Sequence, residues 1–480
     1  MNIKMVFSIL GRTLLIEAVL LLCPLLVGIV YGERSFADYL IPIAGLVAIG
    51  LPLSFLKIKD RSIHVKEGFV TVAFVWILLS LVGAIPFVLS GALPNYADAL
   101  FETVSGFTTT GATVIEDVEA ISHSLLFWRS FTHWIGGMGV LVIVLAILPS
   151  YNSGIMYIFR AESPGPSAGK LVSKLTSTAR ILYGIYILMT VVETIFLLCG
   201  GMNFFDSLTH AFSTAGTGGF GVRNASIGAY NSVYIEMVIA VFMFLFGVNF
   251  NLFYLILIGN FKKAIKSEEF IVYFFLVVGS TLAIAVNILS LVANFGEAVR
   301  YAFFQVTSFS SSTGFSSADF GGWPAFSKAI LIALMVVGAC GGSTGGGMKV
   351  SRVIILVKSA FADIRRLLHP RSVVSTKFEG ETLSKETERN VHTYFILWVA
   401  IVVVCTVLLC IDHNDFLTNF TSTLSCIGNI GPVFSSSGAV GNLAFYSPYS
   451  KVMLSLVMLV GRLEIFPILI MFAPRTWKRG

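Results

Sequence analysis

Four short segments rich in glycine, serine and threonine each lie between two long apolar runs, and they constrain the fold of this chain more than any other feature. Glycine lets backbones approach closely, whereas Ser, Thr and Asn side chains cap helix ends. Such irregular backbone cannot face lipid, because each unpaired amide costs several kcal/mol there, so it must be buried in protein or line a watery cavity. The segments read SGFTTTGAT (Ser105–Thr113), FSTAGTGGF (Phe212–Phe220), FSSSTGF (Phe309–Phe315) and SCIGNIGP (Ser425–Pro432).

The composition indicates an integral membrane protein. Hydrophobic residues make up 56% of the 480-residue chain and charged residues only 12%, and the mean hydropathy is +0.86. A soluble protein of this length would carry about twice that charged fraction. The first apolar run, near residues 5–31, is too long for a signal-peptide core and is followed by no small-residue cleavage site. We therefore expect it to remain as a membrane span.

Apolar runs of spanning length predict ten membrane crossings. They lie near residues 5–31, 36–56, 67–90, 124–149, 181–201, 232–259, 269–293, 327–360, 392–412 and 449–473. Basic residues concentrate in alternate connections, such as Lys57–Lys66, Arg160–Arg180 and Arg352–Arg389. By the positive-inside rule, these connections and both termini are cytoplasmic, and the four Gly-rich segments open to the outside. The acidic residues that would enrich cations at that outer mouth are Asp98, Glu116, Asp117, Glu119, Asp206 and Asp415.

A crossing, a short re-entrant helix with its loop, and a second crossing follow one another four times along the chain. The segments DALFETVSGFTTTG, DSLTHAFSTAGTGG and YAFFQVTSFSSSTG resemble one another, and the fourth copy is placed by its glycine alone. Repeats in membrane proteins usually place the transported solute at their shared axis. We predict an all-α integral membrane protein with four pseudo-repeats of helix, re-entrant pore loop and helix around one pore, plus an N-terminal two-helix hairpin. The predicted units are residues 1–66 (the hairpin), 67–180, 181–268, 269–391 and 392–480.

Each loop offers backbone carbonyl groups just before a glycine. Four such loops around one axis would form a ring of carbonyl oxygens, which is how a protein replaces the hydration shell of a potassium ion. The short helices that lead into the loops would direct their C-terminal carbonyl ends towards the cation. No loop matches the TVGYG of tetrameric potassium channels, so we expect fewer ion sites and weaker discrimination against sodium. The predicted filter residues are Thr109, Thr110, Gly111, Thr217, Gly218, Gly219, Ser312, Thr313, Gly314, Asn429, Ile430 and Gly431.

A further Gly-rich stretch, GACGGSTGGGMKVSR (Gly338–Arg352), interrupts the second crossing of the third unit. Each glycine costs about 1 kcal/mol relative to alanine in a helix, so the helix should break there, beneath the expected filter. A flexible segment at that depth can block a pore and open it by moving. Lys349 and Arg352 end the broken helix, as a solvated basic face or as contacts of a phosphate or a partner. Arg462 lies deep in another apolar run, where a charge normally faces a cavity or a partner.

These motifs together resemble the membrane subunit of the Trk/Ktr/HKT superfamily of potassium transporters, and the added N-terminal hairpin resembles its TrkH type. The resemblance covers essentially the whole chain and rests on the four loops, on GACGGSTGGGMKVSR and on GRLEIFP (Gly461–Pro467). It implies that the Gly-rich stretch gates the pore and that Arg462 lies beside it under the filter, where its charge repels a cation. The implied gating residues are Gly341, Gly342, Ser343, Thr344, Gly345, Gly346, Gly347, Lys349 and Arg462.

The resemblance also implies partners and a location. It implies a homodimer with one pore in each protomer, embedded in the lipid bilayer of the cell membrane. It further implies a cytosolic ring of nucleotide-binding, Rossmann-type regulatory subunits (TrkA-like), which the basic inner loops could dock. Potassium is the expected transported ion. The chain carries no nucleotide-binding motif of its own, and we expect it to hold no organic cofactor.

Two other functional classes were weighed against a potassium conduit. A sodium- or proton-coupled potassium symporter would use acidic or His side chains in a midplane site; the candidates Glu17, Glu193 and Glu464 are few and lie outside the four loops. A membrane enzyme is disfavoured because the sequence has no HExxH, GxSxG, paired intramembrane Asp or Walker A motif. The net charge of +6 is sorted to one side of the predicted membrane, which argues against nucleic-acid binding.

Overall fold

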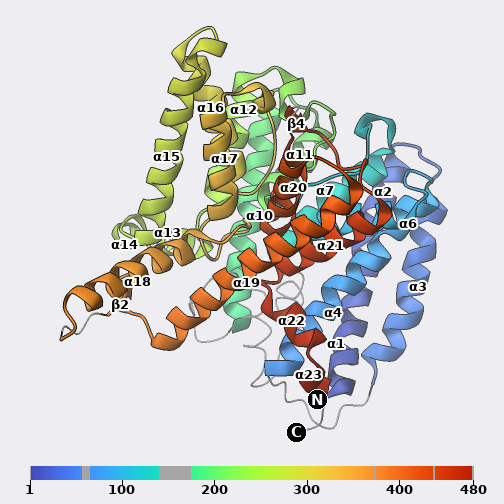
Figure 1. The fold of residues 1–480 in the computed structure, drawn as a ribbon. Coiled ribbons are helices and arrows are strands. Elements are labelled where there is room, and N and C mark those ends of the chain that lie inside the picture. Colours follow the sequence, from blue (N-terminus) through green and yellow to red (C-terminus); the bar gives the residue numbers. More distant parts are fainter. Residues whose placement is uncertain (1, 57–64, 140–174, 372–374, 436–437, 478–480) are drawn as a thin grey trace.

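The computed structural model describes residues 2–56, 65–139, 175–371, 375–435 and 438–477. The described chain is almost wholly helical, as predicted, and it begins and ends at the same end of the molecule, where α1 and α23 lie close together (Figure 1). Several basic residues that served to orient the chain lie outside the described residues, namely Lys57, Lys59, Arg61, Arg160, Lys170 and Lys174.

Six stretches of the described chain are long and apolar enough to span a membrane. They are formed by α1 (Ile3–Leu20) with α2 (Leu22–Val30), α3 (Phe36–Ser54), α4 (Val65–Gly83) with α5 (Ile85–Leu89), α10 (Leu175–Cys199), α15 (Glu268–Ile288) and α19 (Lys385–Leu409). The predicted N-terminal hairpin consists of α1, α2 and α3. Gly11 and Gly50 bring α1 and α3 together so closely that a Cβ at Gly11 would come within 2.9 Å of the Gly50 carbonyl oxygen.

Four shorter helices each end at one of the four loops that the sequence predicts as the filter. They are α6 (Tyr96–Phe107), α11 (Phe204–Gly216), α16 (Phe295–Ser310) and α20 (Phe416–Gly428). Each begins after an Asn or Asp whose side chain accepts a hydrogen bond from the first helical turn, which explains why the chain turns into a helix there. Beyond each loop follows a second helix: α7 (His123–Gly137), α12 (Val233–Phe246), α17 (Ala325–Val337) or α21 (Pro448–Arg462).

Two predicted crossings, residues 232–259 and 449–473, are formed by pairs of helices with a sharp bend between them. The chain bends by 93° between α12 and α13 (Phe250–Leu257), and by 118° between α21 and α22 (Phe466–Phe472). The second bend has a local cause. Pro467 lies in the first turn of α22, a proline disfavours helical backbone just before it, and Glu464 and Ile465 have φ of +55° and +69°.

The crossing predicted at 327–360 breaks where its glycines predicted a break. Helix α17 ends at Val337, and α18 (Val350–Leu368) begins only after an irregular stretch, which we call the Gly-rich segment (residues 338–349). The crossing predicted at 124–149 starts with α7, and its continuation lies outside the described residues.

The remaining elements are short. They are α14 (Phe261–Ile265), α23 (Pro474–Trp477), the 3-10 helices η1 (Val118–Ala120), η2 (Ser226–Tyr230), η3 (Leu289–Leu291), η4 (Phe320–Gly322) and η5 (Cys410–Asp412), and the strands β1 (Lys377–Phe378), β2 (Glu381–Thr382), β3 (Val433–Ser435) and β4 (Gly438–Val440). The strands form two antiparallel hairpins, β1–β2 and β3–β4. They are small additions to an all-α membrane protein.

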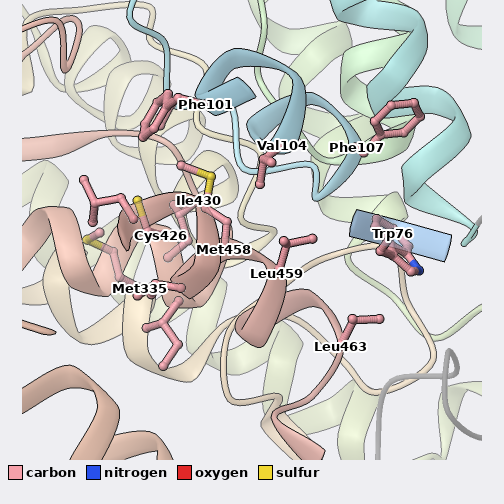
Figure 2. Packing of buried hydrophobic residues seen from close by; sticks show 14 of the residues in the cluster. Trp76, Phe101, Val104, Phe107, Met335, Cys426, Ile430, Met458, Leu459 and Leu463 are labelled. Carbon is pink, nitrogen blue, oxygen red and sulfur yellow. The ribbon is translucent and has the colours of Figure 1, made fainter. Parts of the chain in front are cut away.

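One apolar core joins elements that are far apart in the sequence. Figure 2 shows Trp76 of α4, Phe107 of α6 and Leu459 of α21 around the same buried region, and Ile430 of the fourth loop packs with them. The Phe107 and Trp128 rings meet edge to face, with centroids 5.9 Å apart. Because lipid tails are as apolar as these side chains, close packing stabilises this core more than exclusion from water does.

Candidate functional site

The four loops share one backbone geometry. In the first loop, Thr109 has a φ of +56°, Gly111 has a φ of +78°, and the Thr110 N–H donates to the Ser105 carbonyl at 2.9 Å. Positive φ recurs at Thr217 and Gly219, at Ser312 and Gly314, and at Asn429 and Gly431. The same backbone hydrogen bond recurs from Gly218 to Ser213, from Thr313 to Ser308 and from Ile430 to Ser425. Positive φ strains a residue that carries a Cβ, so the last position of each loop favours glycine.

Each loop glycine faces a backbone carbonyl of the next loop. A Cβ at Gly111 would overlap the carbonyl oxygen of Gly218, so no side chain fits there. The same relation joins Gly219 to Thr313, Gly314 to Ile430, and Gly431 back to Thr110. The circle closes. The carbonyl groups of the residue before each glycine therefore alternate with the four glycines in one ring, formed by Thr110, Gly218, Thr313 and Ile430.

A cavity of about 570 Å³ lies directly against this ring. All four loop glycines line it, together with charged side chains of both signs, Glu116, Asp319, Arg129 and Arg223 among them. The ring is therefore accessible to a small solute from this side, which distinguishes it from an ordinary packing contact between helices.

The acidic residues expected at the outer mouth have divided roles. Glu116 lines the cavity. Salt bridges neutralise two others, Asp98 with Lys451 at 2.7 Å and Glu119 with Arg223 at 3.4 Å. The mouth is therefore less negative than a count of its acidic residues indicates. The other three hold hydrogen bonds with neighbours: Asp117 with Asn224, Asp206 with Tyr230 and Asp415 with Thr418.

Hydroxyl and amide side chains tie the loops together. The Asn429 side-chain amide of the fourth loop donates to the Thr110 hydroxyl of the first at 2.9 Å and to the Met458 carbonyl at 3.1 Å. In the third loop, the hydroxyls of Ser311 and Thr313 are 2.7 Å apart. These side-chain bonds hold the loops together, and the ring itself is formed by backbone carbonyls.

A buried ion pair braces the chain where it leaves the first two loops. The Arg129 Nε of α7 donates to Glu102 Oε1 of α6 at 2.7 Å, and their side chains are only 2% and 0% exposed. Glu102 also accepts from the Thr113 hydroxyl at 3.0 Å, after the first loop. Arg129 donates to the Gly221 carbonyl at 3.3 Å, after the second loop. The pair thereby links the two exits.

His133 of α7 forms a second bridge behind the same loops. Its Nδ1 lies 2.7 Å from the Gly106 carbonyl oxygen, and the Phe220 N–H donates to its Nε2 at 3.3 Å. Because Nε2 accepts this bond, the proton of the neutral ring resides on Nδ1, which donates to Gly106. The fully buried imidazole therefore connects α6 to the second loop.

The Gly-rich segment lies against the loops at the end opposite the cavity. The Gly347 N–H donates to the carbonyl of Gly428, which precedes the fourth loop, at 2.8 Å, and the Gly346 N–H donates to the Ser312 hydroxyl in the third loop. The cavity, in contrast, is lined by the last glycine of each loop. The loops are therefore enclosed between the cavity on one side and the Gly-rich segment on the other.

The same segment also pairs with the bend between α12 and α13. The Cys340 N–H donates to the Gly247 carbonyl, and the Phe250 N–H donates to the Gly342 carbonyl, both at 3.0 Å. The bend frees backbone groups that a straight helix would have used internally. Each of these two interrupted helices thus satisfies polar backbone groups of the other.

Two cationic side chains hold the Gly-rich segment. Lys349, which is 2% exposed, donates through Nζ to the Gly345 carbonyl. Arg462, at the end of α21, donates to the Thr344 carbonyl at 3.1 Å, and also to the carbonyls of Gly136 and Gly137 at the end of α7. The predicted gating residues therefore lie together, with Arg462 in contact with the segment.

The expectation that Lys349 and Arg352 form a solvated basic face or an outward contact is wrong. Both are buried, and Arg352 Nη2 lies 2.5 Å from Glu464 Oε2. The physical reason is that α18 begins at Val350, directly after the buried Gly-rich segment, so that its first turn is still inside the protein.

Three residues support the loops from behind. The sequence predicts a packing role for His133 rather than ligand binding, but it assigns no role to Glu102 and Arg129. One signal for Glu102 was present. Glu102, His210 and Gln305 all stand nine positions before a loop glycine. In the structure, Gln305 Nε2 also contacts the chain beyond its loop, at the Ala318 carbonyl (3.5 Å). A polar side chain at this position can reach forward past the loop.

Comparison with known proteins places this geometry in context. Residues 40–479 match the TrkH family, described as cation transport proteins. The chain is 33% identical to the Trk system potassium uptake protein TrkH of Escherichia coli K12 over the full length of both. It is 32% identical to the protein of the same name from Halomonas elongata, again over both full lengths. The crystal structure of the potassium transporter TrkH from Vibrio parahaemolyticus superposes with a TM-score of 0.89 at 30% identity, covering 100% of each chain.

Proposed function

Because this chain belongs to the TrkH family of cation transport proteins, we propose that it takes up potassium ions across the cell membrane through the ring of the four loops. The single observation that carries the proposal is the closed ring, in which a carbonyl before each glycine meets the glycine of the next loop. Carbonyl oxygens arranged in this way can replace the water around a potassium ion.

The short helices add to the attraction for a cation. Helices α6, α11, α16 and α20 all end at the loops, so the negative ends of their dipoles lie near the ring. Each helix end contributes roughly 0.3–1 kcal/mol to the binding of a charge. The filter residues in this proposal are the twelve residues Thr109–Gly111, Thr217–Gly219, Ser312–Gly314 and Asn429–Gly431.

The Gly-rich segment is the proposed gate. It contacts the third and fourth loops on the side away from the cavity, where it would stand in the path of an ion that has passed the ring. Arg462 holds this segment through Thr344 and places a positive charge close to the same path. Movement of the segment away from the loops would open the path.

The proposal extends to organisation and partners. The chain would consist of the hairpin (1–66) and four units (67–180, 181–268, 269–391 and 392–480), with both termini cytoplasmic. A homodimer with a pore in each protomer and a cytosolic nucleotide-binding subunit of TrkA type would complete the system. The support is the full-length similarity to proteins named as parts of a Trk system.

Potassium flux into proteoliposomes tests this function. We expect purified protein to admit potassium down its electrochemical gradient when the membrane potential is clamped, and to admit sodium more slowly. Sodium and proton gradients are varied independently in the same assay. Uptake that requires one of these gradients would replace the conduit with a sodium- or proton-coupled symporter. The absence of any potassium flux would refute the proposal.

A further inference from the structure

A single buried carboxylate closes the base of the Gly-rich segment. Glu269, in the first turn of α15, is 5% exposed. Its Oε1 accepts the Gly341 N–H at 2.6 Å and the Ser351 N–H at 3.0 Å. These two amides stand on either side of residues 342–350. Glu269 therefore attaches the chain on both sides of residues 342–350 to α15.

The helix that carries Glu269 is itself capped from a distance. Glu379, at the tip of the β1–β2 hairpin, accepts the Ser267 hydroxyl at 2.7 Å, the Glu269 N–H at 3.0 Å and the Glu268 N–H at 3.2 Å. Its own N–H donates to Glu268 Oε2 at 3.3 Å. A carboxylate that accepts the first N–H groups of a helix stabilises that end of the helix and fixes its position.

The hairpin is attached to the Gly-rich segment along the chain as well. The segment leads into α18, β1 packs against α18, and Lys358 of α18 donates to the Lys377 carbonyl at 2.9 Å while pairing with Glu268. The contacts thus form a closed circuit from the segment through α18 and the hairpin to α15, and back through Glu269. Figure 1 shows β2 beside α18 at the edge of the molecule. The hairpin residues other than Phe378 are exposed.

We propose that Glu269 is a positioning residue that holds the Gly-rich segment in its observed place, and that the β1–β2 hairpin controls the segment by capping α15 through Glu379. This inference rests on the proposed gating function and adds its control. Displacement of the hairpin that withdraws Glu379 would loosen the start of α15, shift Glu269 and release the amides of Gly341 and Ser351. A change in the position of the exposed hairpin would thereby change the position of the Gly-rich segment, which we propose as the gate.

Basal potassium flux of the full-length protein, without any partner, is the first test. Glu379→Ala and Glu269→Ala should each raise basal flux, by at least about fivefold, because Glu269 accepts two hydrogen bonds and Glu379 three, and the net loss of even one corresponds to that factor. The double variant should exceed Glu269→Ala by little, because Glu379 acts through Glu269. Glu381→Ala, on the same exposed hairpin, is the matched control and should leave flux unchanged. Independent, multiplying effects of the two substitutions, or no effect, would overturn the proposal.

Hydrogen–deuterium exchange gives a second test that does not depend on transport. In Glu379→Ala, the amides of Gly341 and Ser351 should exchange faster than in the parent and in Glu381→Ala. Unchanged exchange would contradict the circuit even if flux rises. A parent protein that carries no potassium at all refutes the proposed function and leaves exchange to decide the circuit. Should Glu269→Ala fail to insert, Glu269→Gln replaces it, because it keeps the size of the side chain while weakening both bonds.

Discussion

Arg352 and Glu464 form a partly buried ion pair between the start of α18 and the bend that separates α21 from α22. Arg352 Nη2 lies 2.5 Å from Glu464 Oε2, and the guanidinium carbon lies 4.0 Å from the centroid of the Tyr394 ring. Glu464 has a φ of +55°, so the ion pair is made by a residue that the bend itself has turned out of the helix. This pair therefore couples the interrupted helix α17–α18 to the bent helix pair α21–α22.

Replacing only one member of this pair should destabilise the protein more than replacing both members. Arg352→Met removes the guanidinium that donates to Glu464. Loss of one member of a fully buried pair costs roughly 3–5 kcal/mol, and we expect less here because the Glu464 side chain is 21% exposed. The double variant Arg352→Met/Glu464→Leu should recover more than half of that loss. Thermal unfolding in detergent for the complete double-mutant cycle measures it. Losses that simply add would mean that the two side chains do not interact.

Replacing Gly111 or Gly314 by serine should lower the selectivity for potassium over sodium. A Cβ at either position would overlap a carbonyl oxygen of the next loop, Gly218 or Ile430, and would displace it from the ring. Gly91→Ser is the matched control, because Gly91 has a φ of +76° but no atom within 4 Å of an added Cβ. Relative permeability of the two ions is the measurement. Unchanged permeability ratios in both loop variants would remove the ring from the selectivity mechanism.

The ring could be predicted because its determinants are local. Four glycines at corresponding positions, each preceded by a short helix with an Asn or Asp cap, are visible in the sequence, and the break at residues 338–349 follows from its glycines. The bend at Glu464 also had a local signal in Pro467, which the apolar character of the surrounding run obscured. An apolar run reports that a segment lies in the membrane, but it does not report that the segment is straight.

The contacts that support the site could not be predicted in the same way. Arg352 and Glu464 are 112 residues apart, and Glu102 meets Arg129 only because α6 and α7 pack side by side. A charged residue near the end of an apolar run reads as a solvated group unless its partner is known. Partners of this kind are set by the packing of whole helices, which no local pattern encodes.

Shortening the Gly-rich segment should raise basal potassium flux. Deletion of the residues between Gly341 and Gly347 removes the Gly346 N–H that binds Ser312 in the third loop and shifts Gly347 from its contact with Gly428. The path below the ring would then lie open. Flux is compared with the parent after insertion and folding are verified by size-exclusion chromatography. A folded, shortened protein that conducts no faster than the parent would identify the segment as a static kink.

Loss of the buried ion pair between Glu102 and Arg129 should lower both the stability of the protein and its selectivity for potassium. Arg129→Met leaves the Glu102 carboxylate fully buried without its partner, and we expect a loss of roughly 3 kcal/mol in unfolding free energy together with a lower potassium-to-sodium ratio. Arg223→Met is the control. Its salt bridge with Glu119 is about half exposed, with side chains 45% and 43% accessible, and exposed pairs contribute roughly 1 kcal/mol at most. Equal effects of the two substitutions would show that the buried pair has no special role.

Removing the charge of Arg462 should increase the rate of potassium uptake. Its guanidinium donates to the carbonyls of Thr344, Gly136 and Gly137, which place this charge beside the Gly-rich segment. A potassium ion that passes ~6 Å from this charge is repelled by about 3 kcal/mol at an effective dielectric constant near 20. Arg462→Ala removes both the repulsion and the bond that holds Thr344, and it should leave ion selectivity largely intact.

Arg462→Lys separates the two contributions of Arg462. Lysine retains the charge but cannot donate to three carbonyls in the fork geometry of arginine. If repulsion dominates, Arg462→Lys should conduct like the parent, whereas Arg462→Ala conducts faster. If the hold on Thr344 dominates, both variants should conduct faster. Uptake at saturating potassium, in cells that lack other potassium systems, distinguishes these outcomes. A properly inserted Arg462→Ala protein with slower or unchanged uptake would assign Arg462 to the packing of α21 against α7 alone.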